Sequence, residues 1–558
     1  MSRGEDSDST LLPLSRRRFL CSGIAAGASR LPDPISAVGL RSPSDPAMTS
    51  RDAKLKAFEL DEVTIQDLQR AMTSGKASAR SLAEKYLARM QLIDSRGPAL
   101  NSIIESNPDA LTIAQELDRE RKAKGPRGPL HGIPVLIKDN IGTADRMTTT
   151  AGSLALAGSV PGQDSFVARQ LRQAGAVILG KTNLSEWANF RSSHSSSGWS
   201  GRAGQTLNPY ALDRNPCGSS SGSGVAVAAN LCAIAVGTET DGSIVCPSSA
   251  NGIVGIKPTV GLISRSGIVP ISHTQDTAGP MARTVADAAI LLGALTGIDP
   301  RDSATAPSAG KALADYTRFL DPHGLKGARI GVARKYFGFS EAVDQLMNTA
   351  LSVMKREGAV MVDPADLPSF GKFDDSEEQV LLYEFKSDLN AYLASLGPAI
   401  TVRSLRELIE FNERHREREM PYFGQDLFIK AEAKGPLSSK EYTDALDKSR
   451  RLARTEGIDA VMNKFRLDAV VAPTGGPSWV IDLIDGDRGA GGSSNAAAVA
   501  GYPNITVPAG YVFGMPVGIS FFGRAYSEPT LIKLAYSFEQ ATRFRQKPRF
   551  LLTVSLRD

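Results

Sequence analysis

Two short apolar runs, Ile133-Pro-Val-Leu-Ile137 and Ala176-Val-Ile-Leu179, constrain the fold of this chain more than any other feature. Each run is bounded by glycine or polar residues, and apolar runs of this length are typical of buried strands. A helical stretch, residues 165–173, lies between them. Strands that alternate with helices in this way indicate an α/β fold.

Further helical and loop segments follow along the chain. Thr64-Ile-Gln-Asp67 and Ser81-Leu-Ala-Glu84 have the form of capping boxes, which predicts that amphipathic helices begin there. Residues 185–224 are rich in Ser, Gly and Asn, and so long a polar segment inside a domain is typical of a functional loop system. Residues 341–465 are predicted to be a helix-rich elaboration, and strand-like runs return over 467–540.

Composition excludes several classes of function. The 558 residues carry 64 basic and 60 acidic side chains, and no Lys/Arg-rich run follows the N-terminus, so nucleic-acid binding is not expected. No apolar stretch reaches the roughly 18 residues of a membrane-spanning helix. The five histidines lack a helical metal-ligand spacing, so no metal site is expected. No C-x-x-C pair occurs among the cysteines, which predicts neither a zinc site nor a disulfide scaffold; these are Cys21, Cys217, Cys232 and Cys246.

The N-terminus has the pattern of a targeting segment. Residues 15–21, Ser-Arg-Arg-Arg-Phe-Leu-Cys, precede a stretch of small residues and resemble a twin-arginine export signal, with Arg16 and Arg17 as its paired arginines. Small residues at Ala28 and Ala37 offer cleavage sites. We therefore predict a signal and leader over 1–37, a disordered linker over 38–57 and a periplasmic or secreted protein. The alternative is a disordered basic tail. Twin-arginine export carries folded proteins, which suits a large enzyme without disulfides.

Two familiar motifs are present but lack their structural context. Gly175-Ala-Val-Ile-Leu-Gly-Lys-Thr182 matches the phosphate-binding P-loop, but its intervening residues are an apolar strand and not a loop that cradles phosphate. Gly218-Ser-Ser-Ser-Gly222 matches the nucleophile elbow of α/β-hydrolases. That elbow follows a strand, whereas residues 208–216 are loop formers. Neither motif is expected to carry the chemistry.

A third set of motifs accounts for more of the chain. Three segments stand in order: Gly132-Ile-Pro-Val-Leu-Ile-Lys-Asp-Asn140, Pro216-Cys-Gly-Ser-Ser-Ser-Gly-Ser223 and Gly237-Thr-Glu-Thr-Asp-Gly-Ser-Ile-Val-Cys-Pro247. Together they resemble the amidase signature family. The resemblance continues through Gly255-Ile-Lys-Pro-Thr259, Asp276-Thr-Ala-Gly-Pro280, Asn495 and Gly501-Tyr-Pro-Asn-Ile-Thr-Val-Pro-Ala-Gly510. It implies one large α/β/α domain over 58–545, with a mixed central sheet covered by helices and 341–465 as a helix-rich insertion. Residues 546–558 would form a C-terminal tail.

The resemblance implies a serine–serine–lysine triad. Ser243 would be the nucleophile, and Ser219, held by a non-proline cis peptide from Gly218, would relay its proton to Lys138. A lysine serves as a base when burial lowers its pKa towards neutrality. Lys138 follows an apolar strand, where an unpaired ammonium is costly. Residue type alone would instead favour an ion pair between Lys138 and Asp139.

The remaining expectations for the site concern the oxyanion and its supports. Backbone N–H groups of Thr240, Asp241, Gly242 and Ser243 would bind the oxyanion. Ser220 would support the network by hydrogen bonding. The mechanism requires no metal and no organic cofactor.

Three positions depart from the family pattern. The usual Gly-Gly pair is Cys217-Gly218 here, which leaves Cys217 as either a packing substitution or an oxidation-sensitive thiol beside the site. An acidic Asp241 beside the oxyanion hole would repel a substrate carboxylate. Val245 stands where many members carry arginine.

These departures point to the substrate. The variant over residues 239–247 resembles bacterial peptide amidases, which predicts release of ammonia from C-terminal peptide amides. The alternatives are a general aliphatic or aryl amidase, the amidase subunit of a glutamine-dependent tRNA amidotransferase, or an inactive binding protein on the same fold. The export signal and Asp241 disfavour the amidotransferase, and the intact triad disfavours the binding protein. We expect a small-molecule or short peptide amide as the ligand, without partner subunits and without membrane insertion.

Overall fold

The computed structural model describes residues 57–555. The predicted signal over 1–37, and the predicted linker apart from its last residue, lie outside the described residues. All structural statements below concern the described part of the chain.

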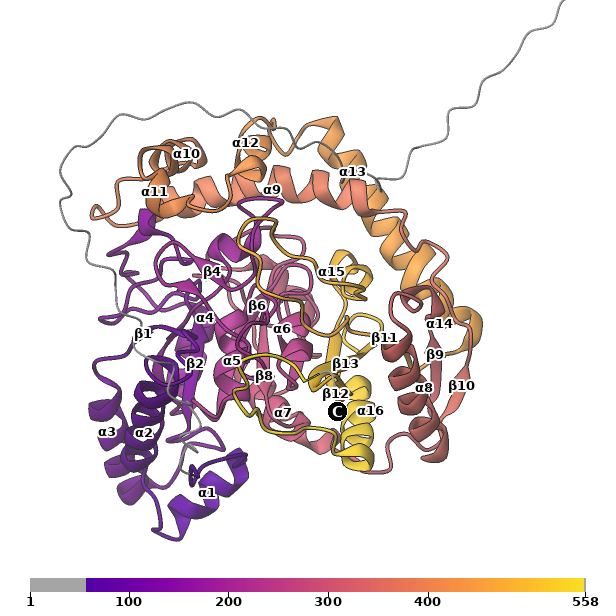
Figure 1. Cartoon of the computed structure of the whole chain (residues 1–558), viewed down its shortest axis with the longest axis horizontal. Coiled ribbons are helices and arrows are strands. Elements are labelled where there is room, and N and C mark those ends of the chain that lie inside the picture. Colours follow the sequence, from indigo (N-terminus) through magenta and orange to yellow (C-terminus); the bar gives the residue numbers. More distant parts are fainter. Residues whose placement is uncertain (1–56, 556–558) are drawn as a thin grey trace, which may run out of the picture. The chain divides into compact units, whose positions relative to one another are not determined.

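A mixed sheet of 11 strands forms the centre of the domain (Figure 1). Its spatial order is β1 (Ile103–Ser106), β3 (Val177–Thr182), β2 (Pro134–Lys138), β6 (Ile234–Glu239), β8 (Thr277–Ala282), β7 (Val254–Lys257), β12 (Asn504–Val512), β13 (Met515–Phe522), β11 (Ala469–Pro473), β9 (Arg329–Val332) and β10 (Val360–Val362). Strand β2 pairs in parallel with both β3 and β6, whereas β8, β7, β12 and β13 pair antiparallel with their neighbours. A separate two-stranded ribbon consists of β4 (Trp199–Ser200) and β5 (Gly204–Gln205). The prediction of an α/β fold with a mixed sheet is confirmed.

Helices cover both faces of this sheet. On one face α4 (Phe166–Gln173), α7 (Val285–Leu295), α16 (Glu528–Thr542) and α8 (Glu341–Arg356) contact one another in succession. On the other face α5 (Ser221–Ala228) and α6 (Val245–Ala250) pack against each other and against the central strands. Two further helices, α2 (Ala79–Arg89) and α3 (Ala110–Lys124), pack together over β2 and β3.

Helix α5 can lie inside the structure because its residues are small. Its sequence is Ser-Gly-Ser-Gly-Val-Ala-Val-Ala, and all eight residues are buried. A Cβ atom added to Gly222 would lie 2.3 Å from the Ser102 carbonyl oxygen, so only glycine permits this approach. The Ser/Gly-rich composition that marks this segment in the sequence therefore serves close packing at the start of the helix.

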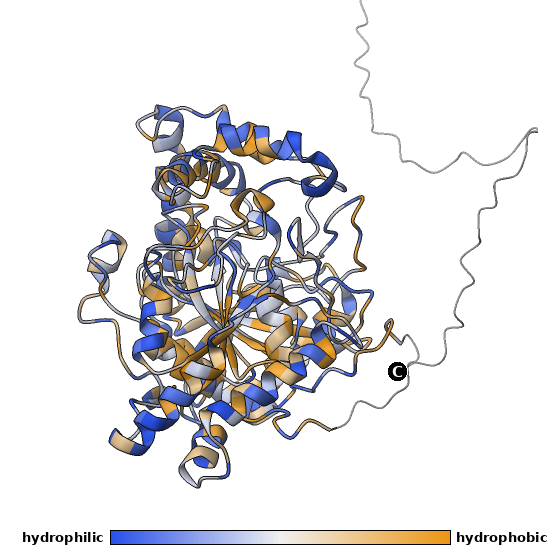
Figure 2. Ribbon diagram, turned by 90° about the vertical axis from the view of Figure 1, so that its left-hand side faces the viewer, coloured by the Kyte–Doolittle hydropathy of each residue, from blue (hydrophilic) through white to orange (hydrophobic). Residues whose placement is uncertain are grey.

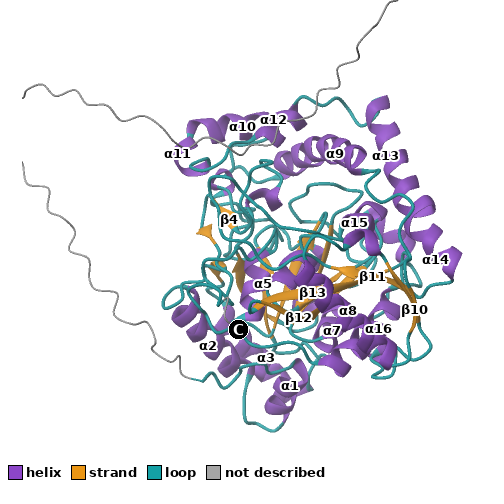
Figure 3. Cartoon of the chain, turned by 45° about the vertical axis from the view of Figure 1, so that its right-hand side comes forward, coloured by secondary structure: helices purple, strands orange, loops and turns teal. Residues whose placement is uncertain are grey.

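A group of helices follows α8 and adds a second apolar cluster. It consists of α9 (Asp374–Ser395), α10 (Leu405–Arg414), α11 (Arg416–Glu419), α12 (Asp426–Glu432), α13 (Lys440–Ala453) and α14 (Asp459–Phe465). Leu382, Phe385 and Phe428 of α9 and α12 pack with Leu156 and Trp187 from loops of the main domain. Figure 3 shows α9, α10, α12 and α13 gathered together beyond the strands. The helix-rich segment predicted over 341–465 is present, but α8 and β10 inside it belong to the sheet layers.

The two predicted capping boxes had different outcomes. Thr64 caps α1 (Ile65–Thr73) together with Asp67, as predicted. The second prediction was displaced by three residues, because Ser78 is the cap of α2 and Ser81 is its third helical residue. Each serine side chain bonds the other's backbone N–H, so the pair satisfies two donors that a helix start leaves free.

Apolar residues gather in the sheet and on the inner helix surfaces (Figure 2). None of the helices in residues 57–555 is both long and apolar enough to cross a membrane. Helix α15 (Asn495–Ala500) lies against α13.

Candidate active site

Lys138 is the last residue of the central strand β2 and is fully buried. Its Nζ lies 2.7 Å from Ser219 Oγ, 2.9 Å from Thr238 Oγ1 and 3.2 Å from the Thr238 carbonyl oxygen. Asp139, the alternative partner, instead accepts hydrogen bonds from Thr150. The structure thus brings Lys138 to Ser219 and not to Asp139.

Burial governs the protonation state of Lys138. It lowers the pKa of the ammonium to about 7, while the negative charges of Asp276 and Glu239 act in the opposite direction. Three polar atoms surround Nζ, and they can form hydrogen bonds with both the charged ammonium and the neutral amine. An ammonium can donate to all three, whereas a neutral amine can donate twice to Thr238 and accept from the Ser219 hydroxyl. The site therefore allows Lys138 to exchange a proton with Ser219 without rearrangement.

Ser219 and Ser220 lie in the loop that leads into α5. The peptide bond between Gly218 and Ser219 is cis, as the family resemblance predicted. A Cβ at Gly218 would lie 2.2 Å from Ser185 Oγ, so the glycine is required by close packing. The Ser220 hydroxyl donates to the Thr238 carbonyl oxygen and accepts from the Thr238 N–H. Ser220 thus orients the residue that holds Lys138.

Ser243 and the predicted oxyanion residues form the turn between β6 and α6. Gly242 has φ of +77°, a conformation that favours glycine, and a Cβ there would lie 3.1 Å from Ser494 Oγ. Among the described residues, no partner accepts a hydrogen bond from the N–H of Thr240, Asp241 or Ser243. The Ser243 hydroxyl is likewise without a hydrogen bond to the described residues, and the residue is 8% exposed. These groups are free to meet a substrate.

Glu239 anchors this turn from the inside. Its Oε2 accepts from the backbone N–H of Ile244 at 2.7 Å and of Val245 at 3.0 Å. Gly242 also lies close to this carboxyl group, and its N–H contributes to the electrostatics of Glu239. Burial raises the pKa of Glu239, and the charge of Lys257 opposes that shift. The sequence motif contains Glu239 but does not indicate this anchoring role.

Asp241 faces other acidic groups. Burial raises its pKa to about 7, and the charges of Glu239 and Asp374 contribute to the shift. Asp374 and Glu377, in the first turn of α9, face it from the helical region. Acidic groups therefore gather on this side of the turn, which is the side that the sequence predicted to repel carboxylates.

A disulfide joins Cys217 to Cys246, so the prediction of no disulfide was wrong. Cys217 is therefore neither a packing substitution nor a free thiol. The bond links the loop that carries Ser219 to the helix that follows Ser243. The two cysteines are 29 residues apart in sequence, and only the packing of α5 against α6 brings them together. Cys232 is buried and unpaired.

The P-loop match and the nucleophile-elbow match both lie in segments that do not have the structure their motifs require. Lys181 and Thr182 of the P-loop match are buried residues of strand β3, and the Lys181 Nζ donates to the Ile141 carbonyl oxygen. In the elbow match, Ser220 is the cap residue just before α5 and follows a loop and not a strand. Both motifs are therefore coincidental matches to their patterns.

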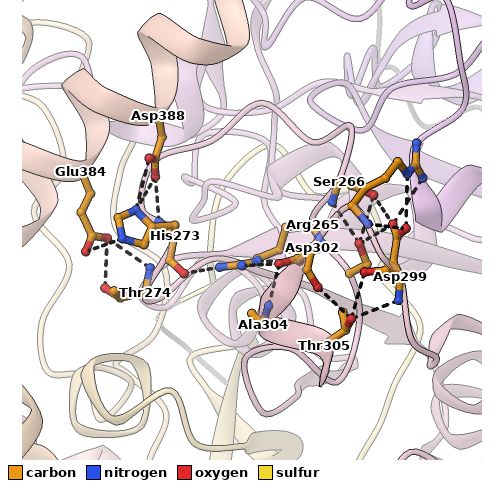
Figure 4. Close-up of polar contacts among 12 residues, drawn as sticks. Arg265, Ser266, His273, Thr274, Asp299, Asp302, Ala304, Thr305, Glu384 and Asp388 are labelled. Atoms are coloured by element: carbon orange, nitrogen blue, oxygen red, sulfur yellow. Dashed lines mark hydrogen bonds and ion pairs between the residues drawn. The ribbon is translucent and has the colours of Figure 1, made fainter. Parts of the chain in front are cut away.

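One group of residues in 57–555 has the composition of a metal site. His273, Glu384 and Asp388 have ligand atoms within 4.8 Å of one another. Their atoms already bond one another and neighbouring groups: His273 meets Asp388, and Glu384 accepts from Thr274 and Tyr442. Figure 4 shows these contacts between α9 and the segment that carries His273. These contacts account for the cluster, since they hold α9 against the segment that carries His273.

The fold and this site define the class of protein. A family model described as Amidase matches residues 81–532, so the chain belongs to the amidase family, hydrolases of the amidase signature type that act on C–N bonds. A crystal structure of native peptide amidase from Stenotrophomonas maltophilia is 52% identical, with a TM-score of 0.84 over 88% of this chain and 100% of that chain.

Two other comparisons agree. A structure of the peptide amidase PAM with the competitive inhibitor chymostatin is 53% identical, with a TM-score of 0.86 over 88% of this chain and 100% of that chain. A probable amidase of Arabidopsis thaliana is 45% identical over 504 residues, which are 88% of this chain and 93% of the relative.

Proposed function

We propose that this protein hydrolyses carboxamides through Ser243, Ser219 and Lys138. The observation that carries the proposal is the 2.7 Å contact between the buried Lys138 Nζ and Ser219 Oγ, beside a turn whose serine and N–H groups are unpartnered. A buried amine with a pKa near 7 is the base that a serine hydroxyl needs.

The proposed reaction has two halves. Ser243 Oγ attacks the amide carbonyl carbon and gives its proton to Ser219, which passes its own proton to Lys138. The tetrahedral intermediate then expels the amine, which takes a proton back from Lys138 through Ser219. Water attacks the resulting acyl ester by the same relay, and Ser243 is regenerated. An amide and water thus give a carboxylic acid and ammonia.

The turn over residues 240–243 would stabilise the intermediate. The N–H groups of Thr240, Asp241, Gly242 and Ser243 would donate to the negatively charged oxygen. Preorganised donors cost no reorganisation during the reaction, and Glu239 supplies that preorganisation from below the turn.

C-terminal peptide amides are the proposed substrates. Two observations support this: structures of peptide amidases are among those similar to this chain, and acidic groups surround the Asp241 side of the turn. Above a pH of about 7, where Asp241 is ionised, its charge disfavours the carboxylate product and a free peptide C-terminus, and it tolerates a neutral amide.

Ammonia release tests the substrate proposal. We expect wild-type protein to release ammonia from a C-terminally amidated dipeptide, and to leave the corresponding free dipeptide intact. Release is measured with a coupled ammonia assay, with simple aliphatic and aryl amides in parallel. Equal or faster turnover of the simple amides would show that the protein is a general amidase instead.

We further propose export by the twin-arginine route. The observation behind it is the Arg16-Arg17 pair, which lies outside the described residues. The disulfide removes the argument from an absence of such bonds, but it fits an exported protein, because disulfides persist in oxidising compartments such as the periplasm. A fusion of residues 1–45 to a reporter should reach the periplasm, and the Arg16→Lys/Arg17→Lys pair should retain it in the cytoplasm. Export that survives both substitutions would refute the proposal.

A further inference from the structure

Residues 271–277, here called the bridging segment, connect the helical region to the turn that carries Ser243. Asp276 lies within this segment and uses both carboxylate oxygens. Oδ2 accepts from the backbone N–H of Ile271 at 2.8 Å and Ser272 at 2.9 Å. Oδ1 accepts from the Thr240 hydroxyl at 2.6 Å. One carboxylate therefore fixes its own loop and the first residue of the oxyanion turn.

Helix α9 holds the same segment from the outside. The N–H of His273 donates to Asp388 Oδ2 at 2.9 Å, and the N–H of Thr274 donates to Glu384 Oε2 at 3.1 Å (Figure 4). Gln275 donates to Glu377 Oε1 at 2.9 Å. Asp276 is thus held on a rigid support, which allows it to fix the position of Thr240.

Asp276 also lines the same pocket as Thr238, the residue that bonds Lys138 Nζ. Asp276 and Glu239 are the acidic groups whose charges oppose the effect of burial on Lys138. Burial raises the pKa of Asp276 to about 6, so the group is ionised at neutral pH. Arg265 is the basic group that faces Asp276 from its other side. Its guanidinium is bonded to Asp302 at 2.6 Å and 2.9 Å, so it does not form an ion pair with Asp276 (Figure 4).

We propose that Asp276 is a positioning residue of this amidase, which anchors Thr240 in the oxyanion turn and stabilises the ammonium form of Lys138 by its charge. The inference rests on the proposed triad and deepens it. When Ser243 attacks, Lys138 gains a proton, and a fixed negative charge opposite it lowers the energy of that state. The motif Asp276-Thr-Ala-Gly-Pro280, which the triad alone leaves without a function, thereby gains one.

Two variants separate the two roles. Asp276→Asn removes the charge, but its Oδ1 can still accept from the N–H groups of Ile271 and Ser272 while its Nδ2 donates to the Thr240 hydroxyl. The rise of kcat/KM on the acid side of the pH profile, here called the acid limb, reports the deprotonation of Lys138. In this variant the acid limb should move to lower pH by about 1 unit, because loss of a neighbouring negative charge lowers the pKa of a lysine by that order. The plateau kcat should fall roughly tenfold, the equivalent of one pKa unit, with KM unchanged. Thr240→Val keeps the charge, so its kcat should fall while the acid limb stays in place.

Asp276→Glu and Asp287→Asn complete the test. Asp276→Glu restores the charge and should restore the acid limb. Asp287 is a buried carboxyl group that bonds the N–H of Ile65 far from Lys138, so Asp287→Asn should affect melting temperature without moving the acid limb. Folding is checked by circular dichroism. If Asp276→Asn does not fold, Asp276→Ser takes its place, because it is also uncharged and its smaller side chain fits the buried site.

The outcomes are distinct from failure of the proposed function. If the wild type is active and the folded Asp276→Asn or Asp276→Ser variant has its acid limb at the same pH, the charge of Asp276 does not act on Lys138. Full kcat in Thr240→Val would overturn the role of the anchor. A wild type that releases no ammonia from any amide would instead refute the proposed function itself.

Discussion

Replacement of Ser243 by alanine should lower kcat for amide hydrolysis by roughly 10⁴- to 10⁶-fold, the range for loss of a serine nucleophile. Without Oγ no acyl ester forms, and the Lys138–Ser219 pair has no hydroxyl to deprotonate. KM should change little, because the N–H groups of the turn and the other residues around Ser243 remain in place. Steady-state ammonia release measures the rate, and mass spectrometry of a quenched reaction detects the acyl-enzyme in wild type alone.

Ser248→Ala is the matched control for this experiment. Ser248 lies on the adjoining helix α6, is fully buried and has a hydroxyl without a hydrogen-bond partner in the described residues. Its removal should therefore leave kcat near the wild-type value. If Ser243→Ala retained more than a few per cent of wild-type turnover, or if both variants lost activity alike, Ser243 would not be the nucleophile.

Replacement of Lys138 by methionine should lower kcat by about 10²- to 10⁴-fold, the contribution expected of a general base. Methionine has nearly the length of lysine and no charge, so the buried site stays filled. In wild type the base must be neutral to act. Because burial lowers the pKa of Lys138 to about 7, activity should rise with pH through about 7 and then level off. The methionine variant should lack this limb.

Stability provides an independent readout of the same substitution. The folded pKa of Lys138 lies below its unfolded value of about 10.5, so the unfolded chain binds the extra proton between these values. The stability of wild type should therefore increase as pH rises through that window, and Lys138→Met should lack the increase. At pH 7 the variant should melt at the wild-type temperature or higher.

Lys181→Met distinguishes a base from any buried lysine. Lys181 lies on the neighbouring strand β3, is fully buried and has a pKa lowered by burial to about 8, but it bonds Ile141 and Thr149 and not Ser219. Its replacement should affect stability and leave the acid limb at the same pH. An acid limb that persists unchanged in Lys138→Met would refute the assignment of the base.

Local patterns in the sequence predicted much of this fold. The apolar runs before Lys138 and Lys181 form the parallel strands β2 and β3. Such runs are too short for a typical helix, and the turns at their ends favour a buried strand. The same reasoning rejected the P-loop match, since strand residues cannot form a phosphate loop. The cap of α2 was misplaced because two serines, Ser78 and Ser81, satisfy the same local pattern.

Contacts between distant segments were beyond such reasoning. The Cys217–Cys246 bond depends on how α5 packs against α6, and cysteine spacing carries no information on that. The anchoring of the turn by Glu239 and of Thr240 by Asp276 depends on where side chains point at the ends of β6 and β8. A motif shows that these residue types stand together, but not which atoms they bond.

The fold class, the family and the candidates Lys138, Ser219 and Ser243 could all be predicted from the chain alone, because strand periodicity and motif order are local properties. Three features required the folded structure. Lys138 contacts Ser219 and not Asp139, a disulfide joins the Ser219 loop to helix α6, and helix α9 supports the segment that carries Asp276. These features arise from burial and from contacts across the sheet, where desolvation sets the pKa of a lysine and distance selects its partner.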